Sequence, residues 1–236
     1  MNTDDAPDTR HVVITGTDSG LGYAFVETFL DDGWVVFAGY IEPDSPILAK
    51  ASDACIPVRL DVTDPGCIRE AGDAVAAHTD RLDMLINNAG IHTGARQPLE
   101  DVDCDAIGRV FDVNAIGPLR VTQRFLGLLK NGALKRIVNV SSEAGSIADC
   151  KRRAGFGYNM SKAALNMQTQ ILHNYLSPSG FSVHAIHPGG MRTRMGSPEM
   201  GFSPEESAEA LFRLITGPDA AEMPRFFQYD GRALPW

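Results

Sequence analysis

Short apolar runs alternate with longer amphipathic segments along most of the chain. Runs rich in β-branched and aromatic residues predict strands at residues 11–15, 34–38, 56–60, 82–86, 136–140, 181–186 and 226–229. Periodic segments predict helices from a glycine-rich loop to about residue 32, and at 65–78, 102–130, 158–176 and 204–216. This alternation predicts an α/β fold, a single-domain doubly wound parallel sheet of the Rossmann type with helices on both faces.

Several of the predicted helices carry local signals at their ends or within them. Asp64 is a good N-cap and Pro65 a good first helical residue, and Ser203 is the expected cap of segment 204–216. Segment 102–130 contains Gly117 and Pro118, so we predict that it is bent or broken near Asn114.

Length, charge and cysteine content narrow the class of protein. The 236 residues suit one domain, predicted over residues 11–236, after a polar, acidic and flexible tail at residues 1–10. The net charge of −9 argues against nucleic-acid binding, and no apolar run approaches the roughly 20 residues that span a bilayer. The four cysteines are scattered, so we expect reduced, mostly buried thiols, no metal site and a cytoplasmic protein.

The loop after the first predicted strand has the form T-G-x-x-x-G-x-G. Gly16 suits a tight turn out of the strand, and Gly22 suits close packing of strand and helix. Gly20 lets backbone N–H groups approach a pyrophosphate at the helix N-terminus. A glycine-rich connection without a ligand is the alternative, but the position between strand and helix favours a dinucleotide site.

Tyr158 and Lys162 are four residues apart, which places both side chains on one face of a helix. A tyrosine hydroxyl has an ordinary pKa of about 10, and a nearby ammonium group favours the phenolate and lowers that value. The pair is therefore a candidate acid/base catalyst. Taken alone, the spacing is weak evidence and is more typical of a surface pair.

Polar and glycine residues recur where predicted strands end. These are the glycine loop, residues 87–90 (N-N-A-G), Ser141-Ser142 and Pro188-Gly189. Singly, they are also typical of turns and caps, and Asn114 of a polar break in a helix. Ligands of doubly wound sheets bind at the carboxyl ends of strands, so their shared location predicts one site.

The order of these motifs resembles that of the short-chain dehydrogenase/reductase family over nearly the whole chain. The sequence runs T-G-x-x-x-G-x-G, Asp61-Val62, N-N-A-G, Asn114, Ser142, Y-x-x-x-K, and P-G-x-x-x-T at Pro188 to Thr193. Residues 145–149, 161–167 and 227–236 also resemble the small bacterial C-factor-like carbonyl reductases. The loop between Ser142 and Tyr158 is a few residues longer than is usual in the family, which leaves Ser141 as an alternative to Ser142.

The resemblance implies a role for each matching residue. Tyr158 would be the acid/base, Ser142 would orient the substrate oxygen, Lys162 would hold the nicotinamide ribose, and Asn114 would complete a proton relay. The implied cofactor contacts, which also include Tyr158 and Lys162, are Gly16, Asp18, Ser19, Gly20, Leu21, Gly22, Tyr40, Glu42, Asp61, Val62, Asn88, Ala89, Gly90, Pro188, Gly189, Met191 and Thr193. Hydride would pass between the nicotinamide and a carbonyl carbon, while groups at the oxygen supply a proton and a hydrogen bond.

The cofactor prediction favours NAD over NADP. A 2′-phosphate needs Arg or Lys near the end of the second strand, and residues 39–44 (G-Y-I-E-P-D) contain neither. Glu42 or Asp44 suits the hydroxyls of an unphosphorylated ribose.

The substrate is a small carbonyl or alcohol compound that the sequence does not identify. Lys151, Arg152 and Arg153 would attract an anionic substrate, or they form a solvated loop. We expect His92, Arg192 and Met195 to border the pocket, and residues 194–202 to form a short lid.

Two other kinds of function and the oligomeric state complete the predictions. A dinucleotide sensor without turnover, and a cofactor-assisted lyase or isomerase, are the alternatives to an oxidoreductase.

The resemblance implies a homodimer or homotetramer, paired through the helix that carries Tyr158 and the long helix before it.

Overall fold

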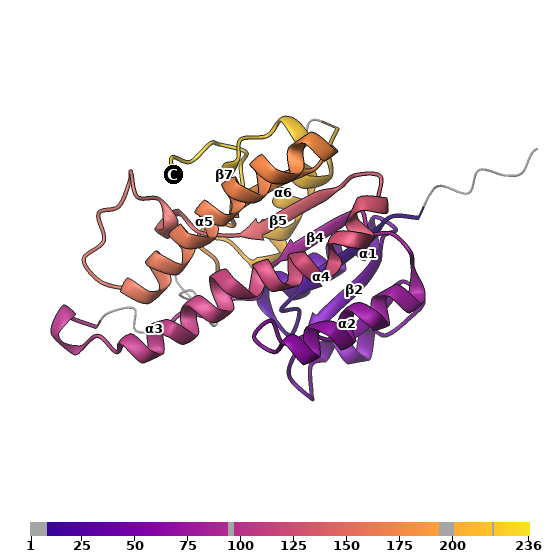
Figure 1. Ribbon diagram of the computed structural model, residues 1–236, viewed down its shortest axis with the longest axis horizontal. Coiled ribbons are helices and arrows are strands. Elements are labelled where there is room, and N and C mark those ends of the chain that lie inside the picture. The colour runs from indigo at the N-terminus through magenta and orange to yellow at the C-terminus, as the bar shows by residue number, and fades with distance from the viewer. Residues whose placement is uncertain (1–8, 94–96, 194–200, 219) are drawn as a thin grey trace, which may run out of the picture.

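The computed structural model describes residues 9–93, 97–193, 201–218 and 220–236. Seven parallel strands form one sheet in the order β3-β2-β1-β4-β5-β6-β7 (Figure 1). The strands are β1 (His11–Thr15), β2 (Val35–Tyr40), β3 (Cys55–Arg59), β4 (Met84–Asn87), β5 (Arg136–Val140), β6 (Ser182–His187) and β7 (Phe226–Gln228). The predicted doubly wound sheet is confirmed, with each strand boundary within two residues of its prediction. The predicted tail, apart from Thr9 and Arg10, lies outside the described residues.

Six α-helices cover the two faces of the sheet (Figure 1). They are α1 (Gly20–Asp31), α2 (Pro65–His78), α3 (Cys104–Phe111), α4 (Gly117–Asn131), α5 (Phe156–Leu176) and α6 (Pro204–Thr216). The predicted caps are present: Asp64 accepts from two backbone N–H groups of the first turn of α2, and Ser203 forms a capping box with Glu206 at α6.

The predicted bend near Asn114 is a π-helical turn, Asp112–Ile116, between α3 and α4. Gly117 packs against Val62, and a Cβ at Gly117 would lie 2.8 Å from the Val62 Cγ2 atom. Pro118 follows in the first turn of α4, where its missing N–H is tolerated. The turn leaves Asn114 fully buried between the helices and the loop after β4.

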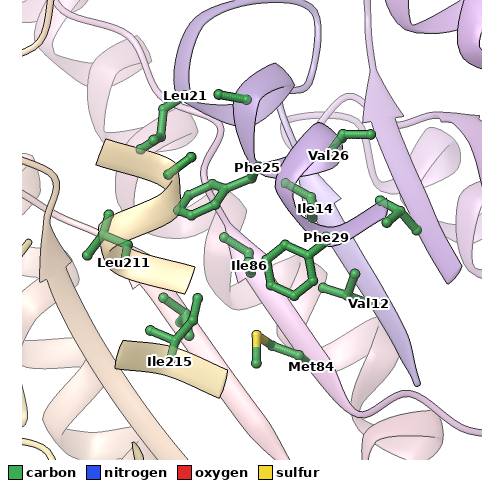
Figure 2. Close-up of a cluster of buried hydrophobic side chains, with 14 of the residues drawn as sticks. Val12, Ile14, Leu21, Phe25, Val26, Phe29, Met84, Ile86, Leu211 and Ile215 are labelled. Atoms are coloured by element: carbon green, nitrogen blue, oxygen red, sulfur yellow. The ribbon is translucent and has the colours of Figure 1, made fainter. Parts of the chain in front are cut away.

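Two apolar clusters, one on each side of the sheet, form the core. The first joins strand residues of β1, β2 and β4 to α1 and α6 through Phe25, Phe29, Leu211 and Ile215 (Figure 2). The second joins the opposite side to α2 and α4. Each fully buried side chain of this size contributes about 1.5–3 kcal/mol, so the two clusters fix the strand ends firmly.

Two buried charges brace the end of the sheet opposite the predicted site. The Asp83 carboxylate accepts from the backbone N–H groups of His11 and Ala133, both at 2.9 Å. The Arg136 guanidinium donates to the carbonyl oxygens of Ile215 (2.6 Å) and Gly217 (3.5 Å) at the end of α6, and the Gly217 oxygen also accepts from the Ala220 N–H at 3.2 Å.

All four cysteines are free thiols, as expected. The expectation that they are mostly buried holds for Cys55 and Cys67, whereas Cys104 and Cys150 are exposed because they lie on α3 and on the loop before α5. Among the described residues, no helix is long and apolar enough to cross a membrane.

The buried His184 makes the stability of the fold dependent on pH. Burial, reinforced by the Arg225 and Arg136 charges, lowers the pKa of His184 from 6.5 to about 4. The neutral ring is therefore favoured by folding. This stabilisation is complete above about pH 6.5 and is lost as the pH falls toward 4, by roughly 3 kcal/mol in total.

We expect the free energy of unfolding of His184→Gln to vary less with pH between 4 and 7 than that of the native chain, because the Gln side chain does not take up a proton in this range. Denaturant unfolding at a series of pH values between 4 and 7 measures the difference from the native chain. His78→Gln, at an exposed position, is the control. Parallel pH dependences of the native chain and His184→Gln would contradict the assignment.

Candidate active site

The glycine loop is shaped by contacts that exclude side chains. Gly16 has φ of 69°, and a Cβ there would lie 2.8 Å from the Ala89 Cα atom. A Cβ on Gly22 would overlap the Gly16 carbonyl oxygen. Gly20 has φ of 60°, and a Cβ there would make an ordinary contact with the Thr193 side chain at 3.5 Å.

The start of α1 is suited to an anion. Residues 20–23 carry no acidic side chain, and within the described residues the Ser19 side chain makes no capping hydrogen bond. Within the described residues, the first backbone N–H groups of α1 therefore have no capping acceptor from Ser19 and no acidic side chain in the first turn. A pyrophosphate fits such a helix N-terminus, so the loop suits the dinucleotide predicted from its sequence.

Asn88 braces the glycine loop from the neighbouring strand. Its Nδ2 atom donates to the carbonyl oxygens of Thr15 and Gly16, both at 2.9 Å. In return, the Thr15 hydroxyl accepts from the backbone N–H groups of Asn88 (3.0 Å) and Ala89 (2.9 Å). The side chain of Asn88 thus shapes the loop, and Thr15 is a supporting residue that the sequence analysis did not single out.

The Asp18 side chain joins the glycine loop to the end of β2. Its carboxylate accepts from the backbone N–H groups of Ile41 (3.2 Å) and Glu42 (3.0 Å). Tyr40 is half-buried beside this bond, and Glu42 and Asp44 are exposed. The structure therefore places a fixed negative charge where the second strand ends.

Asp61 and Val62 lie at the end of β3. The Asp61 carboxylate accepts from the backbone and hydroxyl groups of Thr63 at 2.9 and 2.7 Å. Val62 is buried against Gly117. These residues form one rim of the carboxyl edge of the sheet, next to the π-helical turn.

Tyr158 lies in the first turn of α5, half-buried against the loops after β4 and β5. Its ring contacts that of His92 with centroids 4.3 Å apart and a tilt of 37°, so His92 lies beside the candidate catalytic tyrosine. Burial raises the pKa of Tyr158, while the hydrogen bond with Ser142 and the Arg152 charge lower it. The net direction is upward, opposite to the one expected from the Lys162 spacing, because burial outweighs these contributions.

The structure distinguishes Ser142 from Ser141. The Ser141 hydroxyl is buried and donates to the Asn166 side chain at 2.6 Å. Ser142 follows at the end of β5, with its hydroxyl beside Tyr158 and accepting from the backbone N–H of Ala144 at 3.1 Å. The geometry therefore favours Ser142, not Ser141, as the serine of the site.

Lys162 lies one turn after Tyr158 on the same face of α5. Its Nζ atom is 5.7 Å from the centroid of the Tyr158 ring and donates to the Val140 carbonyl oxygen at 2.7 Å. Burial lowers the pKa of Lys162 to about 8. A Cβ at Gly90 would lie 3.7 Å from this Nζ atom, so the glycine leaves space beside the ammonium group.

Asn114 connects the loop after β4 to α5. Its amide accepts from the backbone N–H of Ile91 (2.8 Å) and donates to the Ile91 carbonyl oxygen (2.9 Å). The same amide donates to the Ser161 hydroxyl at 3.0 Å, and that hydroxyl donates to the Tyr158 carbonyl oxygen at 2.8 Å. Ser161 is a second supporting residue that only the structure identifies.

The segment after β6 closes the other side of the site. The Ser207 hydroxyl of α6 donates to the Pro188 carbonyl oxygen at 2.7 Å, and Gly189 has φ of 84°. Met191 pairs with Phe202, and Thr193 faces Gly20 across the loop. Of these residues, Thr193 lies next to the glycine loop, whereas Gly189 lies against Tyr229 and Phe202.

Other predictions for this segment are corrected or untested. Arg192 donates to the Gly201 carbonyl oxygen at 2.7 Å and lies 3.6 Å from Glu206, so its guanidinium is directed toward the start of α6. Met195 and most of the predicted lid, at residues 194–200, lie outside the described residues. The sequence analysis did not single out His187, which directly precedes Pro188. Burial lowers the pKa of His187, the Glu143 charge raises it and the Arg152 charge lowers it.

Comparisons with known proteins identify similar sequences and structures. A family model described as short chain dehydrogenase matches residues 10–200. C-signal of Myxococcus xanthus is 41% identical over 158 residues, 67% of this chain and 95% of that protein. NADPH-bound carbonyl reductase from chicken fatty liver superposes with a TM-score of 0.87 and 30% identity, covering 97% of this chain and 99% of the other. The Sniffer carbonyl reductase of D. melanogaster gives 0.88 and 25%, covering 97% and 100%.

The tight packing at Gly22 yields a prediction about the glycine loop. We expect Gly22→Ala to lower the free energy of unfolding by about 1–3 kcal/mol, because its methyl group would overlap the Gly16 carbonyl oxygen. Chemical denaturation measures the change. Gly127→Ala is the control, since a Cβ there meets nothing within 4 Å in α4 and improves helix propensity. Equal stability of the two variants would disprove the close approach.

Proposed function

Because this chain belongs to the short-chain dehydrogenase family, whose members are NAD(P)-dependent oxidoreductases, we propose that it transfers hydride between a nicotinamide and a carbonyl or secondary alcohol. The observation that carries the proposal is the grouping of Tyr158, Ser142 and Lys162 at the edge of the sheet that also holds the glycine loop. The carbonyl reductases among the similar structures support this class of substrate.

Each side chain has a role that follows from its position. When bound, the nicotinamide supplies or accepts the hydride. The Tyr158 hydroxyl gives a proton to the substrate oxygen or takes one from it, and the Ser142 hydroxyl donates a hydrogen bond to the same oxygen. Lys162 would hold the ribose hydroxyls of the cofactor, and Asn114 keeps α5 in register with the loop after β4.

The raised pKa of Tyr158 favours one direction of the reaction. A buried phenol stays protonated at neutral pH and is ready to donate to a carbonyl oxygen. Alcohol oxidation needs the phenolate, so it gains from higher pH. Carbonyl reduction near neutral pH is therefore the direction that we propose.

We propose NAD as the preferred cofactor, although NADPH or NADP is bound in several of the similar structures. Residues 39–44 contain no cation for a 2′-phosphate. The Asp18 carboxylate accepts hydrogen bonds from the backbone N–H groups of Ile41 and Glu42. Its negative charge would repel a phosphate group at the end of β2. A ribose hydroxyl can instead donate to a carboxylate.

Dinucleotide titration and turnover test this function together. We expect NADH to bind more tightly than NADPH, and carbonyl compounds to oxidise the bound NADH. Tyr158→Phe should retain binding and lose turnover by about a thousandfold, because the phenyl ring fills the same place without the proton. Binding without turnover by the native chain would favour a sensor, and product formation without net NADH change would favour an isomerase or lyase.

We also propose a homodimer, supported by exposed apolar residues on α4 and α5. Met160, Met167 and Ile171 are 49–63% exposed on α5, and Ile116 is 45% exposed just before α4. Both helices pack on the same face of the sheet, with Val121 and Phe125 of α4 and Leu176 of α5 in one apolar cluster. The free edge of β7 is covered by the chain itself, since Leu234 donates to Phe226 and Gln228 to Arg232 through backbone groups. A tetramer built by extending the sheet at β7 is therefore disfavoured.

Sedimentation velocity tests the dimer. We expect the native chain to sediment as a dimer and Ile171→Glu to sediment as a monomer, because a charge in the interface is left unpaired. Leu99→Glu, at an exposed leucine outside α4 and α5, should leave the dimer intact. A native chain that is monomeric at working concentration would rule out the proposal.

A further inference from the structure

A cavity of about 350 Å³ lies next to the candidate site, between the loop before α5 and the C-terminal segment. Glu143, Ala144, Ser146 and residues 149–152 form one wall. Gln228 and residues 232–235 form the other. Ser142 directly precedes the first of these residues, so the cavity begins beside the serine of the site.

Both walls of the cavity are fixed by backbone hydrogen bonds. The C-terminal segment turns back along β7, with the Leu234 N–H donating to the Phe226 carbonyl oxygen at 2.9 Å. Its end holds the opposite wall, because the Ala148 N–H donates to the Trp236 carbonyl oxygen at 2.9 Å. The Trp236 ring stacks on Phe226 with centroids 5.4 Å apart. The cavity is therefore built by contacts between segments far apart in the sequence.

Cationic side chains outnumber carboxylates in this cavity, although the whole chain has a net charge of −9. Lys151, Arg152 and Arg232 face Glu143 and Asp149. The Arg232 guanidinium donates to the buried Gln228 side chain at 3.1 Å, which orients it. The Asp230 carboxylate, which accepts from the Arg232 backbone N–H at 3.0 Å, lies next to this wall, so the attraction for an anion comes from the individual guanidinium groups rather than from a net positive charge.

Arg152 is the cation best placed to exchange its partner. It pairs with Glu143 at 2.8 Å, and the two side chains are 48% and 58% exposed. Such exposed pairs contribute little to stability, so a carboxylate from a ligand can replace Glu143 at modest cost. A planar guanidinium also binds a carboxylate through two hydrogen bonds.

Arg152 is also close enough to the reactive hydroxyl to affect it. Its charge lowers the pKa of Tyr158 and that of His187, at the end of β6. Glu143, the ion-pair partner of Arg152, directly follows Ser142 in the sequence, so a ligand group held by Arg152 would lie on the Ser142 side of the cavity. Arg153, the neighbouring arginine, is exposed and is not part of the described cavity lining.

We propose that this cavity binds a carboxylate of the substrate, with Arg152 as its main partner and Arg232 and Lys151 in support. The substrates would then be oxo acids, reduced to hydroxy acids. The proposal rests on the oxidoreductase function above and adds the substrate class. The hydride from the nicotinamide forms the new C–H bond at the carbonyl carbon, and the Tyr158 proton completes the alcohol; the carboxylate is unchanged.

Steady-state kinetics with oxo acids of increasing chain length and their methyl esters test the proposal. The native chain should prefer an acid to its ester. Arg152→Gln should raise KM for the acid about tenfold, the loss expected for one charged hydrogen bond, and should leave KM for the ester unchanged. Arg153→Gln is the matched control and should change neither value. Arg232→Gln should have a smaller effect in the same direction as Arg152→Gln.

The outcomes separate this inference from the proposed function. Equal use of acids and esters by the native chain, or equal effects of Arg152→Gln on both, would overturn the carboxylate site and leave the oxidoreductase function standing. NADH binding without reduction of either series or of neutral ketones and aldehydes would overturn both. Each variant is measured with an acid and with its ester. A general change in the reactivity of Tyr158 affects both substrates alike, so it does not change the ratio of their KM values.

Discussion

The buried Asn114 side chain holds together the three elements that form the candidate site. Its amide bonds both backbone groups of Ile91, in the loop after β4, and the hydroxyl of Ser161 on α5. The π-helical turn widens the helix at this position and directs the amide inward. Removing these bonds would leave buried backbone groups unsatisfied, so the places of His92 and Tyr158 depend on one amide.

The fold could be predicted from the sequence because its signals are local. Apolar runs locate all seven strands, and Asp64, Pro65 and Ser203 locate helix starts. The bend near Asn114 was also predicted, since Gly117 and Pro118 are local breakers. The observed strand boundaries differ from the predicted ones by up to two residues. Strand ends depend on pairing with neighbouring strands, and the pattern of apolar residues in one segment carries no information about that pairing.

The sequence motifs predicted the main residues of the site but not the contacts that surround them. Order and spacing placed Ser142, Tyr158 and Lys162 together, but the sign of the Tyr158 pKa shift depends on burial, which the spacing does not report. The Asp18 bond to β2 and the Ala148 bond to Trp236 join residues far apart in sequence. Such contacts depend on loop paths, so the charge at β2 and the cavity beside Ser142 emerge only in three dimensions.

Helix α3 differs from the other helices in how little of it is buried. Of its eight residues only Val110 is buried, and the helix extends beside the start of α5, away from the centre of the sheet (Figure 1). Local opening costs least where few apolar groups are buried, so thermal fluctuations should concentrate here while the glycine loop stays rigid. Since α3 packs on α5, which carries Tyr158, movement of α3 would change the packing of the catalytic helix and leave the two apolar clusters of the core in place.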